Sequence, residues 1–238
     1  MGASRGIGRG IAASLAREGV RVALASRSRE RLADAVTAIE GETVWFEADT
    51  SDLDRLAALP GEVESTLGPV DILVTNTGGP PLGGALDNPR DEWELAYRSL
   101  VLAPRTLVGA ALPGMRGRHW GRIVNVGSSS VIEPIPNLAL SNAHRMATVG
   151  FLKTLAAEVA DDGVTVNTVA TGRFATDRLA SNWGSLEEME RHAHVGVPAG
   201  RLGRPEEYGD LVAFLCSERA AYLTGTVIPL DGGLLRSA

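Results

Sequence analysis

The first stretch of the 238-residue sequence that could do chemistry is a glycine-rich run at its amino end. Glycine tolerates the positive φ of a tight turn and lets backbone N–H groups approach a ligand closely. A helix that opens from such a loop directs its free N–H groups, and the positive end of its dipole, toward an anion. The run therefore predicts a pyrophosphate-binding loop, and its candidate binding residues are Gly2, Ser4, Arg5, Gly6, Ile7 and Gly8.

Two arginines bear on which dinucleotide such a loop would bind. An expected strand over residues 20–25 is followed by Ser26 and Arg27, with no acidic residue at this point. An acidic residue here suits the ribose 2′-hydroxyl of NAD, whereas an arginine suits the 2′-phosphate of NADP. Arg5 in the loop adds a second guanidinium, a group that binds phosphate through two parallel hydrogen bonds. The pattern favours NADP(H) over NAD(H); alternatively, both arginines are ordinary solvated side chains.

These residues must be positioned by a regular alternation of strands and helices. Apolar spacing predicts strands over residues 20–25, 43–47, 71–75, 122–126, 164–169 and 227–230, and helices over residues 7–17, 29–39, 53–67, 90–112, 141–159 and 205–216. Such alternation is typical of right-handed crossovers that build a parallel sheet with helices on both faces. We expect a doubly wound, Rossmann-like α/β fold in one domain over residues 1–238. The loops at Asn76, Ser128 and Thr171 should then meet the glycine-rich loop at one sheet edge.

The start of the sequence departs from this pattern. A dinucleotide-binding loop should follow a buried strand, yet Met1 stands directly before Gly2. We expect the first strand of the sheet to be missing from the sequence. Its loss would leave two rows of unpaired backbone groups in the middle of the sheet, so an unstable fragment is one interpretation.

Composition limits the possible partners. The chain is 44% apolar and 22% charged, with a net charge of −6, so it offers no basic field for a nucleic acid. Cys216 is the single cysteine, which excludes an intrachain disulfide and is typical of a reducing compartment. No apolar run is long enough to span a bilayer, and no signal segment is present. We expect a cytoplasmic protein with neither a membrane nor a nucleic acid as partner.

Several short segments occur in an order that is typical of one family. They are Gly2–Gly8, Asp49, Asn76-Thr77-Gly78-Gly79, Gly121–Ser128, Val164–Asn167, Gly172 with Thr176, Gly200–Glu207 and Leu223–Gly233. Together they resemble the short-chain dehydrogenase/reductase family, over essentially the whole chain. The resemblance implies that Asp49 contacts adenine and that Thr171, Gly172 and Thr176 close over the nicotinamide end, with Asn76 and Gly78 in the loop beside it. It also implies a small-molecule substrate and a homo-oligomer, tetramer or dimer, packed through the helices over residues 90–112 and 141–159.

The resemblance fails at the residues on which the family's chemistry depends. Family members use an Asn, a Ser, and a Tyr and a Lys one helical turn apart. Here the Ser position is Ser128, the Tyr position is Ser141, the Lys position is Arg145 and the Asn position is Leu100. An alkyl hydroxyl is a much weaker acid than a phenol, whose pKa is about 10, so Ser141 is no simple substitute for Tyr. Arg145 keeps the positive charge and can bind ribose hydroxyls.

Ser128, Ser141 and Arg145 are therefore the candidate catalytic residues, and other groups could supply the missing proton donor. His144 on the same helix is an acid–base group near neutral pH; alternatively, it is a surface or interface histidine. Tyr97 on a preceding helix could reach the site or pack between helices, and a water held by Ser128 and Ser141 could relay a proton.

Two further segments could shape a substrate pocket. The loop over residues 78–84 is either a stiff pocket wall or a rigid connector. The insert over residues 174–197 carries Trp183, Met189 and His192, which line the pocket or form the apolar side of a helix.

Two functions remain open on the sequence alone. The first is an NADP(H)-dependent carbonyl reductase or alcohol dehydrogenase, similar to 3-oxoacyl reductases, with an altered catalytic set. The second is a module that binds NADP(H) without turnover, a sensor or a structural protein. No metal site is predicted.

Overall fold

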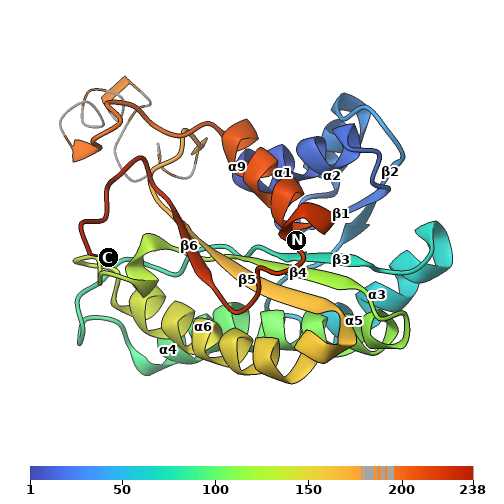
Figure 1. Ribbon diagram of the computed structural model, residues 1–238. Helices are drawn as coiled ribbons and strands as arrows, with labels where there is room; N and C mark the ends of the chain where they lie inside the picture. Colours follow the sequence, from blue (N-terminus) through green and yellow to red (C-terminus); the bar gives the residue numbers. More distant parts are fainter. Residues whose placement is uncertain (178, 180–184, 186, 189–190, 192–195, 238) are drawn as a thin grey trace.

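The computed structural model describes residues 1–177, 179, 185, 187–188, 191 and 196–237, and strands alternate with helices along them (Figure 1). The strands are β1 (Val22–Ser26), β2 (Thr43–Glu47), β3 (Ile72–Thr75), β4 (Gly121–Val126), β5 (Val164–Thr171) and β6 (Val227–Leu230). The helices are α1 (Gly6–Arg17), α2 (Arg29–Ala38), α3 (Leu53–Leu67), α4 (Arg90–Tyr97), α5 (Ala103–Gly117), α6 (Ala139–Val159) and α9 (Pro205–Leu215). The predicted α/β class is confirmed, and the predicted element boundaries differ from these by only a few residues.

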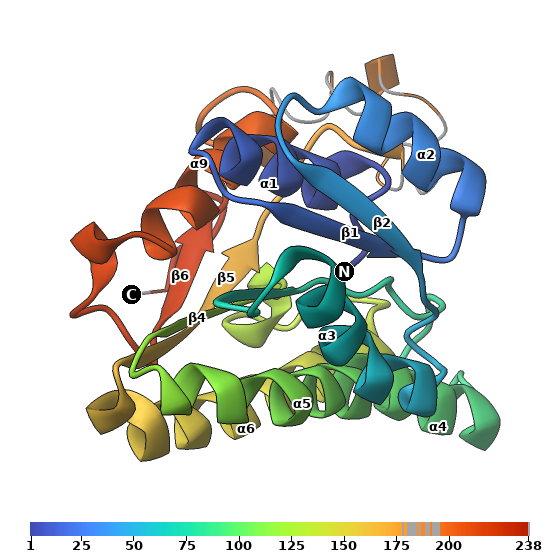
Figure 2. The ribbon, with the colours of Figure 1, turned by 90° about the vertical axis from the view of Figure 1, so that its right-hand side faces the viewer.

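The strands form two parallel groups. One pairs β1 with β2, and the other has the order β3-β4-β5-β6. Helices α1 and α9 pack against each other on one side, while α4, α5 and α6 run together on the other side (Figures 1 and 2). All residues of β4 are buried, as are all residues of β5 except the last, which is typical of parallel strands covered on both faces.

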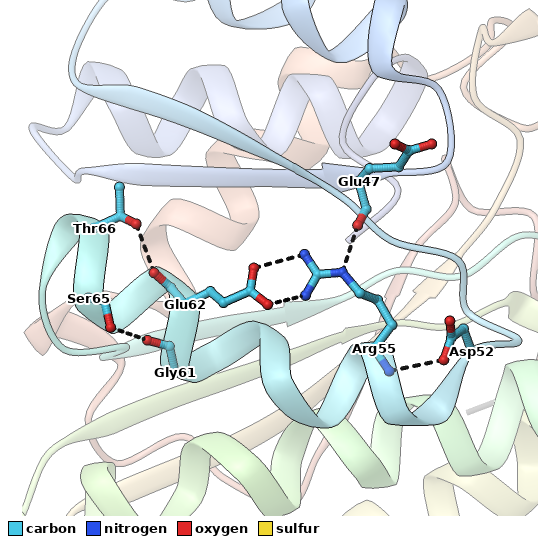
Figure 3. A network of polar contacts seen from close by, with 7 residues as sticks. All are labelled: Glu47, Asp52, Arg55, Gly61, Glu62, Ser65 and Thr66. Carbon is cyan, nitrogen blue, oxygen red and sulfur yellow. Dashed lines mark hydrogen bonds and ion pairs between the residues drawn. The ribbon is translucent and has the colours of Figure 1, made fainter.

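Helix α3 is fixed to the end of β2 by a small polar network (Figure 3). The Asp52 carboxylate caps the helix by accepting a hydrogen bond from the Arg55 backbone N–H at 3.0 Å. The Arg55 guanidinium donates to the Glu47 carbonyl at 3.0 Å and pairs with the Glu62 carboxylate through both oxygens. This network fixes the connection between β2 and α3, and that connection carries Asp49.

The sheet is interrupted between β1 and β3. The Met1 amino group donates to the Val74 carbonyl at 3.1 Å, and the Ala3 N–H donates to the Ala25 carbonyl at 3.2 Å. A mainly apolar cleft of about 630 Å³ lies between the two strands and extends from these contacts. The first three residues thus connect the two groups of strands at one end of the cleft.

Burial at this point lowers the pKa of the Met1 amino group from 8.0 to about 6. Between these values the unfolded chain binds the proton and the folded chain releases it, so stability rises with pH across this window. We expect the free energy of unfolding to increase by about 2 kcal/mol from pH 6 to pH 8. Urea unfolding of the protein with Met1 retained checks this, with the amino-acetylated protein as control. An equal increase in the acetylated protein would contradict the assignment.

Candidate cofactor and active site

A cavity of about 740 Å³ opens where the glycine-rich loop meets the carboxyl ends of β1 and β3. Most of the predicted cofactor-binding residues line it: Gly2, Ser4, Arg5, Gly6, Ile7, Gly8, Arg27, Asp49, Asn76, Gly78 and Thr176. Arg145, Thr171 and Gly172 do not line it. The Arg145 guanidinium does donate a hydrogen bond to the carbonyl of Gly78, which lines the cavity. The structure therefore brings together loops that are far apart in sequence.

The glycine-rich loop leaves no room for side chains at two positions. A Cβ on Gly8 would lie 2.1 Å from the Gly2 carbonyl oxygen, and Gly2 itself has a φ of +59°. The Asn76 amide donates to that same carbonyl at 3.3 Å, which fixes the loop against the end of β3. The loop backbone is thus held close to the first turn of α1, whose N-cap residue, Arg5, offers no side-chain capping bond.

A second group suited to phosphate lies at the end of β1. The Arg27 side chain is 78% exposed, and its Nε is 4.0 Å from an Asp49 carboxylate oxygen. The other Asp49 oxygen accepts hydrogen bonds from the Ser51 N–H at 2.8 Å and the Ser51 hydroxyl at 2.9 Å. The Ser26 hydroxyl is buried and has no hydrogen-bond partner within the described part of the chain. A buried hydroxyl without a partner, next to an exposed guanidinium, suits a ligand that brings acceptor oxygens.

Arg145 connects three parts of the candidate catalytic region. Its guanidinium donates to the Ser141 hydroxyl at 3.2 Å, to the Val126 carbonyl at 3.1 Å and to the Gly78 carbonyl at 3.4 Å. Val126 ends β4, two residues before Ser128, so these bonds hold α6 against the end of that strand. The Ser128 hydroxyl accepts a hydrogen bond from the Ser130 N–H at 3.1 Å. Ser141 and Arg145 thus form a directly bonded pair beside the segment that carries Ser128.

Leu100, at the family's Asn position, is buried and packs with Ala96, Leu140 and Trp93. It lies in the π-helical turn Arg98–Leu102, which joins α4 to α5. Its carbonyl accepts a hydrogen bond from the Thr148 hydroxyl at 2.6 Å. Turns of this kind are frequent at functional sites, but here the side chain is apolar and offers no hydrogen bond to a water.

The two alternative proton donors lie elsewhere. The buried His144 ring is 5.2 Å from the Trp93 ring and 6.2 Å from the Tyr97 ring, and its Nδ1 is 2.7 Å from the Leu140 carbonyl oxygen. Tyr97 is 47% exposed, and neither residue lines the cavity. His144 is therefore a residue of α6 that packs against α4 and does not line the cavity.

Of the two segments expected to shape a substrate pocket, the structure describes the loop over residues 78–84 in full and the insert over residues 174–197 only in part. Gly78 through Pro81 line the cavity, whereas Gly83 pairs through its backbone with Asn137 and Ala139. The loop is thus a cavity wall at its start and a connector at its end. Trp183, Met189 and His192 lie outside the described residues.

Thr171 and Gly172 stabilise the ends of β5 and β6. The Thr171 hydroxyl is 2.9 Å from the hydroxyl of the fully buried Tyr208 on α9. Burial raises the pKa of Tyr208 well above its usual value, so this phenol stays neutral. A Cβ on Gly172 would lie 2.4 Å from the Cα of Asp231. The sequence offered no signal for the role of Tyr208, which fits an apolar helix face equally well.

The carboxyl-terminal tail contacts the segment that follows Ser128. Glu133 accepts hydrogen bonds from the Ser237 hydroxyl at 2.6 Å, the Ser237 N–H at 2.9 Å and the Arg236 N–H at 3.3 Å. These bonds, chiefly those from Ser237, hold the pKa of the Glu133 carboxyl below its ordinary value.

Among the described residues, no group of three or more His, Cys, Asp or Glu side chains is placed to hold a metal ion. Across the same part of the chain, every helix is too short or too polar to cross a bilayer.

Comparison with known proteins identifies the family. The model of the family described as Enoyl-(Acyl carrier protein) reductase matches residues 2–235. Dehydrogenase/reductase SDR family member 4 of Bos taurus is 35% identical over 97% of this chain and 84% of its own length. The chain belongs to the short-chain dehydrogenase/reductase family. A second family member, the 3-oxoacyl-[acyl-carrier-protein] reductase FabG of Vibrio harveyi, is 36% identical over 98% of this chain and 94% of its own length.

Two solved structures agree with this chain in fold. YwfH, described as an NADPH dependent reductase involved in bacilysin biosynthesis, aligns with a TM-score of 0.95 at 28% identity, covering 100% of this chain and 97% of its own. A short chain oxidoreductase from Pseudomonas aeruginosa PAO1, described as containing an atypical catalytic center, aligns with a TM-score of 0.91 at 29% identity, covering 100% of this chain and 96% of its own.

Proposed function

We propose that this protein is an NADP(H)-dependent oxidoreductase that acts on a carbonyl or alcohol group of a small molecule, in the manner of a 3-oxoacyl reductase. The observation that carries the proposal is the 740 Å³ cavity, in which the glycine-rich loop meets Arg27 and the unpartnered Ser26 hydroxyl. The FabG relative and the NADPH-dependent structural neighbour YwfH support it.

The residues present fit the cofactor. Gly2 and Gly8 keep the loop backbone open, and the uncapped start of α1 offers N–H groups to a pyrophosphate. Arg27 and Ser26 would hold a 2′-phosphate, and Asp49 would contact the adenine. A nicotinamide cofactor held by these residues would supply the hydride for reduction of a carbonyl, or accept it in the reverse direction.

The chain's own residues would polarise and position the reacting carbonyl. Because the Arg145 guanidinium donates to the Ser141 oxygen, the Ser141 proton is directed elsewhere and is free to bind a substrate oxygen. Ser128 would provide a second hydroxyl, and the fixed charge of Arg145 would stabilise negative charge that develops on that oxygen. Arginine stays protonated in proteins, so the proton must come from a water bound to these hydroxyls. We expect slow turnover for this reason.

A second candidate function is NADP(H) binding without turnover. Two observations favour it: the buried apolar Leu100 at the Asn position, and the lack of a phenol at Ser141. The relative with an atypical catalytic center favours the enzymatic alternative. Calorimetry with NADPH, followed by turnover assays on a carbonyl panel that includes 3-oxoacyl thioesters, separates the two. Binding without turnover of any substrate would exclude the enzyme.

We expect Arg27→Ala to lower NADPH affinity by about 10- to 100-fold while NADH affinity changes little, because a charge-assisted hydrogen bond contributes about 1.5–3 kcal/mol. Arg29→Ala is the matched control, since Arg29 pairs with Glu47 at 3.1 Å and does not line this cavity. Titration of both variants with both nucleotides measures the effect. Equal losses for NADPH and NADH would contradict the preference for NADP(H).

We propose that the protein works as a homo-oligomer, dimer or tetramer, in a reducing, cytoplasmic compartment. Tyr97 at the end of α4 and Met146 on α6 are large apolar side chains, 47% and 52% exposed, and exposed apolar side chains of this kind suit contact with a second copy. Light scattering coupled to size exclusion tests the assembly, and a monomer at micromolar concentration would exclude it. The acidic net charge of −6 gives no support to a nucleic acid partner.

A further inference from the structure

The carboxyl-terminal tail, residues 231–237, leaves β6 and turns back toward the chain that precedes α6 (Figure 1). Gly232 and Gly233 make the turn, and both have a positive φ that suits glycine. The Asp231 carboxylate holds the turn, because one oxygen accepts from the Gly233 N–H at 2.9 Å and the other from the Leu235 N–H at 2.7 Å. The course of the tail is therefore set before it reaches its last contact.

The start of the tail is attached beside the end of β5. The Gly172 N–H donates to the Leu230 carbonyl at 3.0 Å, and the Ala199 N–H donates to the Gly232 carbonyl at 2.9 Å. One end of the tail is thus joined both to the end of β5 and to the chain just after the insert over residues 174–197.

The other end of the tail meets a single carboxylate oxygen. Oε1 of Glu133 accepts all three bonds from the tail, those of the Ser237 hydroxyl, the Ser237 N–H and the Arg236 N–H. Oε2 of Glu133 accepts no hydrogen bond within the described part of the chain. Bonds to an ionised acceptor are roughly twice as strong as those between neutral groups, so this contact attaches the tail firmly.

Glu133 lies in the segment that joins the two candidate catalytic hydroxyls, Ser128 and Ser141. The part nearest Ser128 is the 3-10 turn Ser129–Val131, closed by short-range bonds such as that from the Glu133 N–H to the Ser129 carbonyl at 3.1 Å. A single 3-10 turn has poorer hydrogen-bond geometry than an α-helix, so its position depends on what holds its ends. One end continues from β4, and the other is Glu133.

The rest of this segment is held from a different side. The Asn142 side-chain amide, on α6, donates to the Ile135 carbonyl at 2.9 Å. The Gly83 N–H donates to the Asn137 carbonyl at 2.9 Å, and the Ala139 N–H donates to the Gly83 carbonyl at 3.2 Å. These contacts fix the approach to α6, and the tail acts at the opposite end of the segment.

We propose that Glu133 is a positioning residue for the substrate. By holding its carboxylate, the tail keeps the chain beside Ser128 in place, so that the Ser128 hydroxyl is directed at the same substrate oxygen as the Ser141 hydroxyl. The proposal rests on the proposed function, in which these two hydroxyls bind that oxygen. Neither Glu133 nor the tail lines the cofactor cavity, so the effect falls on the substrate and not on NADPH.

Four variants of the full chain test this role. Glu133→Ala removes the acceptor, and Ser237→Ala removes one of its three donors. Glu133→Gln is the conservative variant, because its carbonyl oxygen can take the place of Oε1 and its NH2 group that of Oε2. Glu158→Ala is the matched control, since Glu158 is an exposed carboxylate in the last turn of α6.

Steady-state kinetics and NADPH titration measure the effect. We expect Glu133→Ala to raise the KM for the carbonyl substrate by about 10-fold, the factor that corresponds to one charge-assisted hydrogen bond, and Ser237→Ala to raise it by about threefold. Glu133→Gln should recover most of the loss. The kcat and the NADPH dissociation constant should stay within about twofold of the parent values, as for a loss of substrate binding alone.

A merely structural role would give a different pattern. Partial unfolding reduces the number of active molecules, which lowers the apparent kcat at an unchanged KM. That result for Glu133→Ala, an unchanged KM, or a Glu133→Gln variant as impaired as Glu133→Ala would each overturn the proposal.

Amide hydrogen exchange separates this proposal from the proposed function. The N–H groups of Val131 and Ile132, which bond to the carbonyls of Ser128 and Ser129, should exchange about 10-fold faster in Glu133→Ala, while the amides of β4 stay unchanged. Unchanged exchange at both groups would overturn the positioning role. Faster exchange in a chain whose parent reduces no carbonyl would support the tail's hold on this turn and contradict the proposed function instead.

Discussion

Replacing Gly8 by alanine should weaken NADPH binding by about 100-fold or more. The new Cβ would lie 2.1 Å from the Gly2 carbonyl oxygen and 2.9 Å from the Asn76 amide nitrogen. Neither neighbour can retreat cheaply, because the first is backbone and the second is hydrogen-bonded to it. The loop must open, and displacing a binding group by about 1 Å can cost about 10²-fold. Calorimetric titration with NADPH measures the loss.

Gly109→Ala is the matched control for this substitution. Gly109 lies in α5, is exposed, and has no atom within 4 Å of an added Cβ. Alanine there should leave NADPH binding unchanged and stabilise the fold by up to about 1 kcal/mol. If Gly8→Ala bound NADPH within threefold of the parent while remaining folded, the glycine-rich loop would not be the pyrophosphate site.

Restoring the family's acid–base pair should give the largest gain in activity. We expect the double substitution Ser141→Tyr with Arg145→Lys to raise kcat/KM by about 10²- to 10⁴-fold, the usual contribution of a positioned proton donor. The two positions are one helical turn apart and already in hydrogen-bond contact at 3.2 Å. A phenol there can donate its proton, and a neighbouring ammonium lowers its pKa toward neutrality. Steady-state reduction of a carbonyl substrate by NADPH measures the gain.

The single substitution Arg145→Lys separates chemistry from binding. Arg145→Lys alone should lose the contacts to Val126 and Gly78 without supplying a proton donor, so it should not raise turnover. A double variant that binds NADPH as tightly as the parent, yet gains no turnover, would favour the binding module. The buried Leu100 would then be the next position that limits turnover, because its apolar side chain cannot hydrogen-bond a water behind residues 141 and 145.

Much of the fold was predictable because it depends on local patterns. A continuous apolar run favours a buried strand, and such a run became β4. The spacing of Gly2, Gly6 and Gly8 likewise favours a tight loop at the start of a helix. The cavity followed from topology, since parallel strands bring their carboxyl ends to one edge.

Contacts between distant residues were not predictable in the same way. Nothing near Thr171 indicates that its hydroxyl meets Tyr208, which is 37 residues away. His144 has the chemistry of an acid–base group, but only packing shows that it lies between Trp93 and Tyr97. The three contacts of Arg145 likewise depend on where α6 lies relative to the end of β4, and helical periodicity does not determine that placement.

The bond between Glu133 and Ser237 has a practical consequence for protein engineering. A purification tag or reporter fused to the carboxyl end would crowd the Ser237 contacts to Glu133, which lies five residues beyond Ser128. Kinetic constants from such a fusion would include any change in those contacts. An untagged or cleaved preparation is therefore the sound reference for every variant described above.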